Sequence, residues 1–256
     1  MSSITEHTRV NVAGRIVLLS GLHIGAGRDT VEIGGMDNPV IKHPHTHEPY
    51  IPGSSIKGKL RSLLEWGFGK LRHSDGKPWG AEENNENATH DPDDPVLRIF
   101  GNALKKWQAG PTRLMLRDAH LDKGWSKQVT DDGRPLTEEK WEVLIDRISG
   151  KAKDGVGPRQ TERVPAGAAF DFAMTFRVFD TGDGGARDLA CLNWVLQGLD
   201  LLEQDALGGS GSRGYGRIRF ENLTLTPRGG VAMPLDNRFR GHPFRREAPP
   251  PIWAPA

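Results

Sequence analysis

The alternation of large apolar residues in residues 169–179 constrains the fold more than any other stretch of the sequence. Every second position is a large apolar residue: Phe170, Phe172, Met174, Phe176 and Val178. Successive side chains of a β-strand point to opposite faces, so all five share one face. The stretch therefore predicts a strand with one buried face.

Five further segments have regular patterns. They predict strands over residues 9–20, 113–119 and 216–226 and helices over residues 54–66 and 188–207. The apolar phase of the last strand shifts, which indicates a bulge near Glu221. Ser54 or Ser55 can cap the first helix, and Asp188 the second. In chain order the six segments read β-α-β-β-α-β, so we expect an α+β, ferredoxin-like (RRM-like) core.

Two large insertions interrupt this core. We expect one domain over residues 1–256, with its core in 9–66, 112–119 and 169–227, insertions at 67–111 and 120–168, and a C-terminal extension at 228–256. The second insertion contains a predicted helix over residues 138–149, with Thr137 as its cap. Trp141, Leu144, Ile145 and Ile148 would form its buried stripe. Insertions of this size usually serve binding.

Composition favours a cytoplasmic protein with no membrane partner. The chain has one cysteine, Cys191, which rules out a disulfide within one chain. Because Cys191 lies in an apolar helical pattern, we interpret it as a buried structural residue. The N-terminus lacks a basic region followed by an apolar run, and no stretch approaches the roughly 18 apolar residues of a membrane span.

The formal net charge of +1 conceals a strongly uneven distribution. Residues 42–72 carry six Lys or Arg against two acidic residues, and residues 213–247 carry eight Arg against three. Residues 75–94 hold seven acidic residues and one Lys, which cancel the basic segments in the total. Basic segments of this kind are either solvated surfaces or phosphate-binding sites.

Several polar motifs leave alternatives open. The stretch GGSGSRGYGR at 208–217 is either a flexible helix-ending loop or a loop whose backbone N–H groups, with Arg213 and Arg217, contact RNA phosphate. His23 either contacts RNA, serves as an acid or base, or forms a turn. The alternating histidines 43, 45 and 47 invite comparison with metal sites, but they lie in a polar turn, and we assign them no function.

Asp37 lies in GGMDNPVIK, between glycines and a proline. An aspartate in this setting is often a turn former. Alternatively, the loop presents a carboxylate to bound RNA. There it could help hold a Mg²⁺ ion and help a 2′-hydroxyl attack the adjacent phosphorus. Spacing alone does not decide between the two.

The run GLHIGAGRDTVEIGGMDNPVIK, with PYIPGSSIKGKLRSLL after it, closely resembles the repeated backbone subunit of type III-A (Csm-type) CRISPR effector complexes, a RAMP-superfamily protein. The resemblance continues through RIFG, RLMLRDAHL, IDRISGKAKDGVGPRQTERVPAGAAFDF and GGSGSRGYGRIRF, in the order of the family.

The resemblance implies a ferredoxin-like core whose insertions form a lid and a thumb hairpin. Copies would stack into a helical filament along the guide crRNA, together with other type III-A subunits. Thumbs would kink the duplex of guide and complementary target RNA at regular intervals. The target would be cut at those intervals by a metal-dependent reaction, with Mg²⁺ or another divalent cation, leaving a 2′,3′-cyclic phosphate.

The resemblance also assigns residues. The family motif D-x-P-V-I-[KR] corresponds to DNPVIK, which makes Asp37 the catalytic and metal-binding residue. The thumb would lie within 150–168. The predicted RNA-binding residues are His23, Ser54, Lys57, Lys59, Arg61, Arg159, Arg163, Arg213, Tyr215 and Arg217.

Three alternatives stay open. The chain could be a related RAMP subunit that binds guide RNA without cutting. It could be a nuclease that processes precursor guide RNA. It could also be a small-molecule enzyme that uses its Gly-rich loop for a nucleotide.

Overall fold

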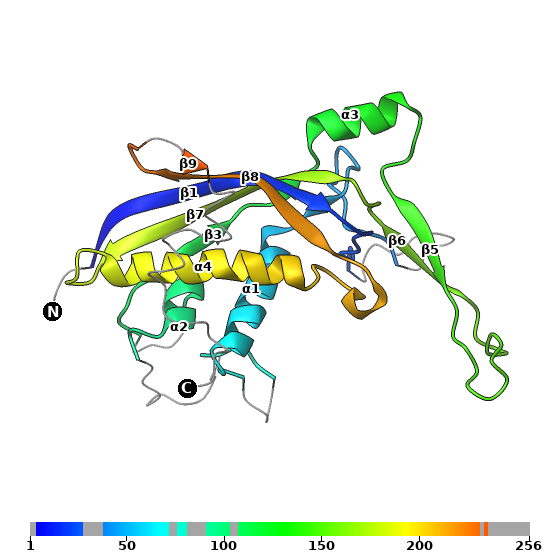
Figure 1. Ribbon diagram of the computed structural model, residues 1–256, viewed down its shortest axis with the longest axis horizontal. Helices are drawn as coiled ribbons and strands as arrows, with labels where there is room; N and C mark the ends of the chain where they lie inside the picture. Colours follow the sequence, from blue (N-terminus) through cyan, green and yellow to red (C-terminus); the bar gives the residue numbers. More distant parts are fainter. Residues whose placement is uncertain are drawn as a thin grey trace.

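An antiparallel sheet with helices on one face forms the body of the protein (Figure 1). The computed structural model describes residues 4–27, 38–71, 76–80, 91–102, 107–230 and 233–234. Its strands are β1 (Thr5–Leu18), β2 (Tyr50–Ile51), β3 (Leu114–Leu116), β4 (Ala119–His120), β5 (Glu138–Glu142), β6 (Arg159–Arg163), β7 (Ala169–Asp180), β8 (Ile218–Pro227) and β9 (Met233–Pro234). Its helices are α1 (Gly53–Gly67), α2 (Pro95–Phe100), α3 (Lys123–Asp131) and α4 (Ala186–Gln204).

The sheet order confirms the predicted fold class. The main sheet runs β3-β7-β1-β8-β9, and β1 pairs antiparallel with both β7 and β8. The predicted strands are β1, β3, β7 and β8, and the predicted helices are α1 and α4, in the chain order β-α-β-β-α-β. The first strand therefore lies between the third and the fourth, as a ferredoxin-like core requires.

The core lies between the sheet and helices α1 and α4. The alternating residues of β7 are all at most 2% exposed, which confirms their shared buried face. The stripe of α4 facing them is also buried: Leu192, Val195, Leu196, Leu199 and Leu202. Phe172 meets Phe220 of β8 edge to face, with ring centroids 4.9 Å apart. Burial of these aromatic and aliphatic side chains is the main stabilising contribution to the fold.

The predicted bulge near Glu221 is present. Between Ala13 and Arg15 the pairing partner on β8 jumps from Thr224 to Glu221, and Asn222 adopts a positive φ of 54°. Gly14 lies opposite the bulge, where a Cβ would approach the carbonyl oxygen of Glu221 to 2.7 Å. A side chain at this position would therefore force the strands apart.

The predicted serine caps of α1 are wrong. The helix begins at Gly53, its N-cap is Pro52, and no side chain of the cap residue makes a hydrogen bond there. Instead the backbone N–H of Gly53 donates to Asp118 Oδ1 at 2.7 Å. A carboxylate distant in sequence thus occupies the positive end of the helix, in place of a local serine.

The predicted cap of α4 is also wrong. The helix starts at Ala186 after Gly185, a residue in the left-handed region with a φ of 85°. Asp188 lies one turn inside, fully buried, and accepts hydrogen bonds from Arg98, Arg113 and the backbone of Phe179. A buried carboxylate paired with two guanidinium groups has a larger structural role than a helix cap.

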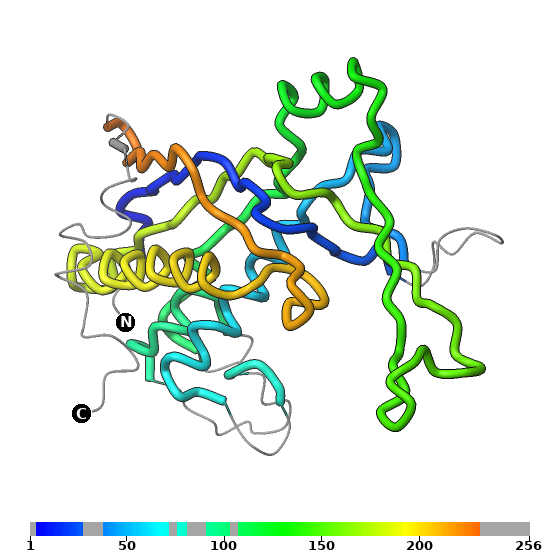
Figure 2. The backbone as a smooth tube through the Cα atoms, turned by 45° about the vertical axis from the view of Figure 1, so that its right-hand side comes forward, coloured from blue at the N-terminus to red at the C-terminus, as the bar shows by residue number. Residues whose placement is uncertain are grey.

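The predicted helix over residues 138–149 is wrong as well. Residues 138–142 form β5, which pairs in register with β6 from Glu138 opposite Arg163 to Glu142 opposite Arg159. The paired strands form a hairpin that projects from the body (Figures 1 and 2). The supposed buried stripe lies exposed, and Ile148 is 98% accessible. The periodicity was that of a helix, but no surface covers the stripe, and cross-strand pairing sets the backbone instead.

The insertions contain two helices that the sequence did not predict. In the first insertion, α2 begins after Asp94, which accepts from the N–H of Leu97 at 3.1 Å. In the second, α3 begins after Asp122, which accepts from the N–H of Trp125 at 2.9 Å. Both helices are short, and α2 packs Val96, Ile99 and Phe100 into the core. Much of the predicted lid lies outside the described residues, as does most of the C-terminal extension.

Cys191 is buried, and burial raises the pKa of its thiol to about 12. This confirms the structural interpretation, since a thiol with so high a pKa is unreactive at neutral pH. Among the described residues, no helix combines the length and the apolar character needed to cross a membrane.

Candidate functional site

Glu162 of β6 holds residues 38–42, which follow Asp37 in the sequence. Its backbone N–H donates to the carbonyl oxygen of Asn38 at 3.0 Å. Its carboxylate accepts from the N–H of Val40 at 2.9 Å and from Lys42 Nζ at 2.6 Å. The side chain of Asn38 in turn donates to the carbonyl oxygen of Gln160 at 3.1 Å. The segment is therefore fastened along the base of the β5–β6 hairpin.

The carboxylate of Glu162 is buried and yet ionised. Burial by itself raises its pKa, but hydrogen bonds from Lys42, Thr137 and the Val40 N–H outweigh that effect and hold the pKa below its ordinary value. The anion at this position is thus stabilised by three donors from two segments of the chain, Val40 and Lys42 in one and Thr137 in the other.

Glu162→Gln is expected to lower the free energy of unfolding by about 1–3 kcal/mol at neutral pH, because charge-assisted hydrogen bonds are lost. The pKa of Glu162 is lower in the folded state than in the unfolded state, where it is near 4.5, so the ionised carboxylate stabilises the fold above that pH. This stabilisation is lost as the pH falls through the folded-state pKa. The difference in unfolding free energy between wild type and Glu162→Gln should therefore disappear at acid pH. Denaturant titrations across the pH range measure it, with the exposed Glu139→Gln as the matched control. A gap that stays constant down to acid pH would contradict the assignment.

Asp37 itself lies outside the described residues, so its catalytic and metal-binding roles stay predictions. Within the described part of the chain, no group of three or more His, Cys, Asp or Glu residues could hold a metal ion. The histidines at 43–47 build a turn instead: Nδ1 of His43 accepts from the N–H groups of His45 and Thr46 at 3.3 and 3.4 Å. These residues therefore present no ready cage for a cation.

His23 connects the hairpin to the Gly-rich loop. Its Nδ1 lies 2.7 Å from the carbonyl oxygen of Glu162, and its own carbonyl oxygen accepts from the N–H of Gly209 at 2.9 Å. Gly208 has a φ of 77°, and a Cβ there would come within 2.4 Å of that same carbonyl oxygen. The loop thus approaches His23 so closely that residue 208 has to be glycine.

The Gly-rich loop carries two exposed arginines. The guanidinium of Arg213 is 3.4 Å from Glu142 Oε2 of the hairpin, and Arg217 is exposed at the start of β8. Several backbone N–H groups of the loop donate within the protein, among them those of Gly209, Gly214 and Gly216. The loop therefore offers RNA mainly the two guanidinium groups, and phosphate contact by its backbone stays a prediction.

Tyr215, in contrast, is fully buried. Lys140 Nζ lies 4.3 Å from the centroid of its ring, and the guanidinium carbon of Arg163 lies 5.2 Å from it. The ring has no free face for a base in this conformation. RNA contact by Tyr215 stays a prediction, and its burial argues against it.

The predicted RNA-binding residues of α1 differ in their accessibility. Ser54 is exposed in the first turn. Lys57 points inward, donating to Thr112 Oγ1 at 3.2 Å and to the Leu114 carbonyl oxygen at 3.0 Å, and burial lowers its pKa. Lys59 pairs with Asp205 at 2.8 Å.

Arg61 lies further along α1 and is likewise engaged. Its Nε donates to Glu65 Oε1 at 2.7 Å, and its guanidinium lies 5.9 Å from the ring centroid of Phe100. Of the four predicted residues of this helix, Ser54 is thus the most accessible to a ligand.

The hairpin supplies the remaining predicted contacts. Arg159 is exposed at the start of β6, while Arg163 donates to Glu138 Oε1 at 2.6 Å across the hairpin. Exposed apolar side chains gather on the hairpin and its connecting loop: Trp141, Val143, Leu144, Ile145, Ile148 and Val156. Sequence reasoning missed this exposed apolar surface because it interpreted the same residues as the buried stripe of a helix.

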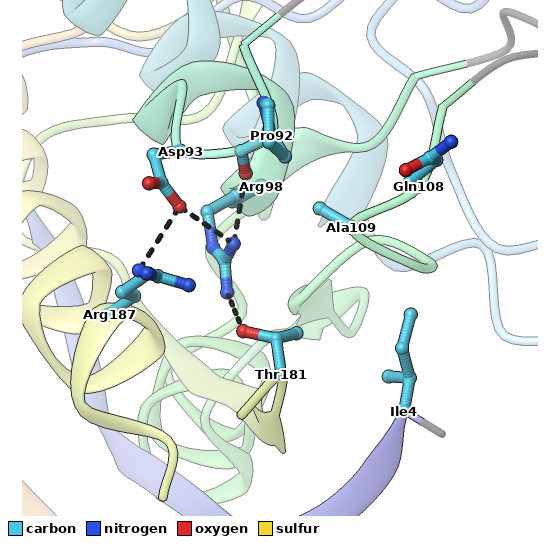
Figure 3. A pocket seen from close by; sticks show the side chains of 8 residues that line it. All are labelled: Ile4, Pro92, Asp93, Arg98, Gln108, Ala109, Thr181 and Arg187. Carbon is cyan, nitrogen blue, oxygen red and sulfur yellow. Dashed lines mark hydrogen bonds and ion pairs between the residues drawn. The ribbon is translucent and has the colours of Figure 1, made fainter. Parts of the chain in front are cut away.

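A separate cavity of about 530 Å³ lies between α2 and the start of α4, away from the β5–β6 hairpin (Figure 1), and Figure 3 shows the residues that line it. Arg98 on its wall bonds to the Pro92 carbonyl oxygen, Thr181 and Asp188, and Asp93 bridges Arg98 and Arg187. The charged residues that line the cavity, Asp93, Arg98 and Arg187, are thus already engaged in ion pairs with one another. None of the sequence-predicted site residues lines it.

Comparisons with known proteins agree on one family. The RAMP superfamily matches residues 15–219. The CRISPR system Cms endoribonuclease Csm3 of Methanothermobacter thermautotrophicus is 38% identical over 231 residues, covering 85% of each chain. The protein of the same name from Enterococcus italicus is 37% identical and covers 84% of this chain and 90% of its own.

A solved structure is similar as well. A chain of the Csm3-Csm4 subcomplex of the type III-A CRISPR-Cas interference complex is 26% identical and superimposes with a TM-score of 0.51. The match covers 91% of this chain and 84% of that one.

Proposed function

The chain belongs to the RAMP superfamily, and from this we propose that it is an RNA-cleaving subunit of a type III CRISPR interference complex. One observation carries the proposal furthest. Residues 38–42, which follow Asp37 in the sequence, are bonded to the base of the projecting hairpin through Glu162. The residue next to Asp37 is thus fastened to a hairpin able to distort a duplex.

The hairpin has the chemistry of a wedge between bases. Its exposed apolar side chains can contact the faces of unstacked bases, and Arg159, where the connecting loop enters β6, can contact phosphate. Insertion of apolar side chains between base steps unstacks and kinks a duplex. We infer that the hairpin acts in this way on the duplex of guide and target RNA.

The guide strand would lie along the body of the protein. His23, Ser54, Arg213 and Arg217 are accessible or partly accessible there, and they offer an imidazole, a hydroxyl and two guanidinium groups. Contacts of this type bind phosphate and 2′-hydroxyl groups without reading sequence. Base pairing between guide and target would supply the specificity.

We assign the chemical step to Asp37. The 2′-oxygen of the target nucleotide attacks the adjacent phosphorus, the O2′–P bond forms, and the P–O5′ bond breaks. The carboxylate accepts the 2′-hydroxyl proton, and a proton from solvent reaches the leaving 5′-oxygen. The products are a 2′,3′-cyclic phosphate and a 5′-hydroxyl. A divalent cation, when bound, would neutralise charge on the phosphate, and we assign no ligand to it other than Asp37.

A cleavage assay with the reconstituted complex tests this function. Complementary target RNA should be cut at constant intervals, the fragments should end in a 2′,3′-cyclic phosphate, and chelation of divalent cations should stop the reaction. An intact target would identify a subunit that binds guide without cutting. Cleavage of free repeat RNA by this chain alone would identify a processing nuclease instead.

Arg159→Ala is expected to weaken target binding several-fold and to reduce the slope of log affinity against log salt by about 1, because one phosphate contact is lost. Filter binding of labelled target across a salt series measures both quantities. Arg134→Ala is the matched control, since Arg134 is exposed and pairs with Asp132 in the connection before β5. The same slope in Arg159→Ala as in wild type would remove Arg159 from the interface.

Arg163→Ala is a poorer test of phosphate contact. The side chain of Arg163 bonds to Glu138 and covers the ring of Tyr215, so its loss would also disturb the hairpin. Any loss of target binding by that variant would combine both effects.

A further inference from the structure

The two strands at the base of the hairpin each place a cation over one aromatic ring of the Gly-rich loop. Lys140 of β5 and Arg163 of β6 lie 4.3 and 5.2 Å from the ring centroid of Tyr215. Both distances are within the range of cation–π attraction, which is strongest where the ring is desolvated. Tyr215 has no exposed surface. The contact therefore joins two segments that are more than fifty residues apart in the sequence.

Tyr215 itself is fixed to the body. Its neighbours Gly214 and Gly216 both have positive φ, 83° and 72°. The N–H of Gly216 donates to the Gly21 carbonyl oxygen at 2.9 Å, and its carbonyl oxygen accepts from the N–H of Leu207 at 2.9 Å. A Cβ at residue 216 would lie 2.0 Å from the carbonyl oxygen of Leu207, which follows α4, so the loop passes this close only because residue 216 is glycine.

The hairpin contacts the same region through its other side chains. The aliphatic stem of Arg163 packs on Gly21, where a Cβ would come within 2.4 Å of Arg163 Cδ. Glu142 lies 3.4 Å from Arg213 of the loop. The base of the hairpin is thus held from the side of the Gly-rich loop as well as from the side of Glu162.

A two-stranded hairpin without support is only marginally stable, and a small rotation at its base becomes a large displacement at its far end. We propose that Tyr215 is a positioning residue that fixes the angle at which the β5–β6 hairpin leaves the body. What this means for RNA rests on the proposed function. The Gly-rich loop, which contacts the guide, and the hairpin, which enters the duplex, would move as one unit. The spacing between cleavage sites on the target RNA would then depend on the ring of Tyr215.

The ring, and not the hydroxyl group, carries this role. The phenol oxygen of Tyr215 makes no hydrogen bond of normal geometry among the described residues, although burial and the nearby Glu142 raise its pKa, whereas both cations lie over the ring. Tyr215→Phe should therefore rescue the orientation that Tyr215→Leu loses. A residue that read RNA through its hydroxyl group would give the opposite result.

Spin labels on the full-length chain test the proposal without RNA. Labels at Ser149→Cys in the hairpin loop and Gln204→Cys at the end of α4 report the distance between hairpin and body, and the buried Cys191 stays unlabelled. We expect the distance distribution to widen about twofold or more in Tyr215→Leu and to return to the wild-type width in Tyr215→Phe. Equal widths in Tyr215→Leu and wild type would overturn the proposal, as would a Tyr215→Phe distribution as wide as that of Tyr215→Leu.

If Tyr215→Leu does not fold, Lys140→Met provides a second test of the proposal. It removes one cation from the ring at a partly exposed position and should widen the distribution, whereas Lys153→Met in the hairpin loop should not. An unchanged width in Lys140→Met would count against the proposal.

Target cleavage supplies the second measurement. The variant with a widened distribution should cut the target at irregular positions, and Tyr215→Phe should restore the spacing. If the wild-type complex does not cut RNA, the proposed function fails while the spin-label result on Tyr215 still stands. Regular cutting by a variant with a widened distribution would overturn the link between Tyr215 and the cut interval.

Discussion

Asp188→Ala is expected to lower the free energy of unfolding by about 3–5 kcal/mol, the typical effect of removing one partner from a buried ion pair. Asp188 is fully buried, with Arg98 Nε at 2.9 Å, Arg113 Nε at 2.8 Å and the Phe179 N–H at 2.8 Å. Both guanidinium groups are themselves almost completely buried. Without the carboxylate, the buried Arg113 would lose its counter-ion, and the buried Arg98 would keep, among the described residues, only Asp93 at 3.5 Å. Denaturant unfolding followed by circular dichroism measures the loss.

Asp154→Ala is the matched control, because Asp154 is exposed in the hairpin loop and its loss should change stability by less than about 0.5 kcal/mol. The combined variant Arg98→Met, Arg113→Met and Asp188→Leu should recover part of the stability, since it removes all three buried charges together. A loss below about 1 kcal/mol in Asp188→Ala would mean that solvent reaches the pair after the substitution.

The core could be predicted from the sequence because its elements carry their own periodicity. Phe170 to Val178 alternate over a strand that is buried on one face, and Leu192 to Leu202 repeat over a helix that packs against it. In both cases the local pattern and the tertiary burial agree. The bulge near Glu221 was predictable for the same reason, since a phase shift in a strand has few structural explanations.

The hairpin could not be predicted in the same way. Residues 138–149 have a helical pattern, and only the long-range pairing of Glu138 with Arg163 turns the segment into a strand. The role of Asp188 was missed because its partners, Arg98 and Arg113, are distant in sequence. Helix capping is a local inference, whereas charge pairing in the interior depends on which segments the fold brings together.

For the candidate site, too, the sequence predicted some features and could not predict those that depend on distant neighbours. Motif resemblance identified Asp37, His23 and the Gly-rich loop, and the structure brings the last two into contact. The same resemblance assigned Lys57, Arg61 and Tyr215 to RNA. Their inward hydrogen bonds and ring contacts depend on neighbours such as Thr112, which no local pattern indicates. The resemblance predicted what these side chains could bind, but only the fold determines what they face.

Asp37→Ala is expected to reduce target cleavage by about 10²-fold or more, the usual contribution of a positioned acid or base, while assembly and target binding stay at the wild-type level. The separation follows from the architecture, because the hairpin base is held by Glu162, Asn38 and Val40, and none of these contacts involves the side chain of Asp37. Single-turnover cleavage by the complete complex, with target binding measured in parallel, tests both parts. Asp154→Ala serves as the control for a lost surface carboxylate. If Asp37→Ala cuts at the wild-type rate, another group performs the reaction. The hairpin would then remain a duplex-binding element, but its proposed link to cleavage through residues 38–42 would have to be abandoned.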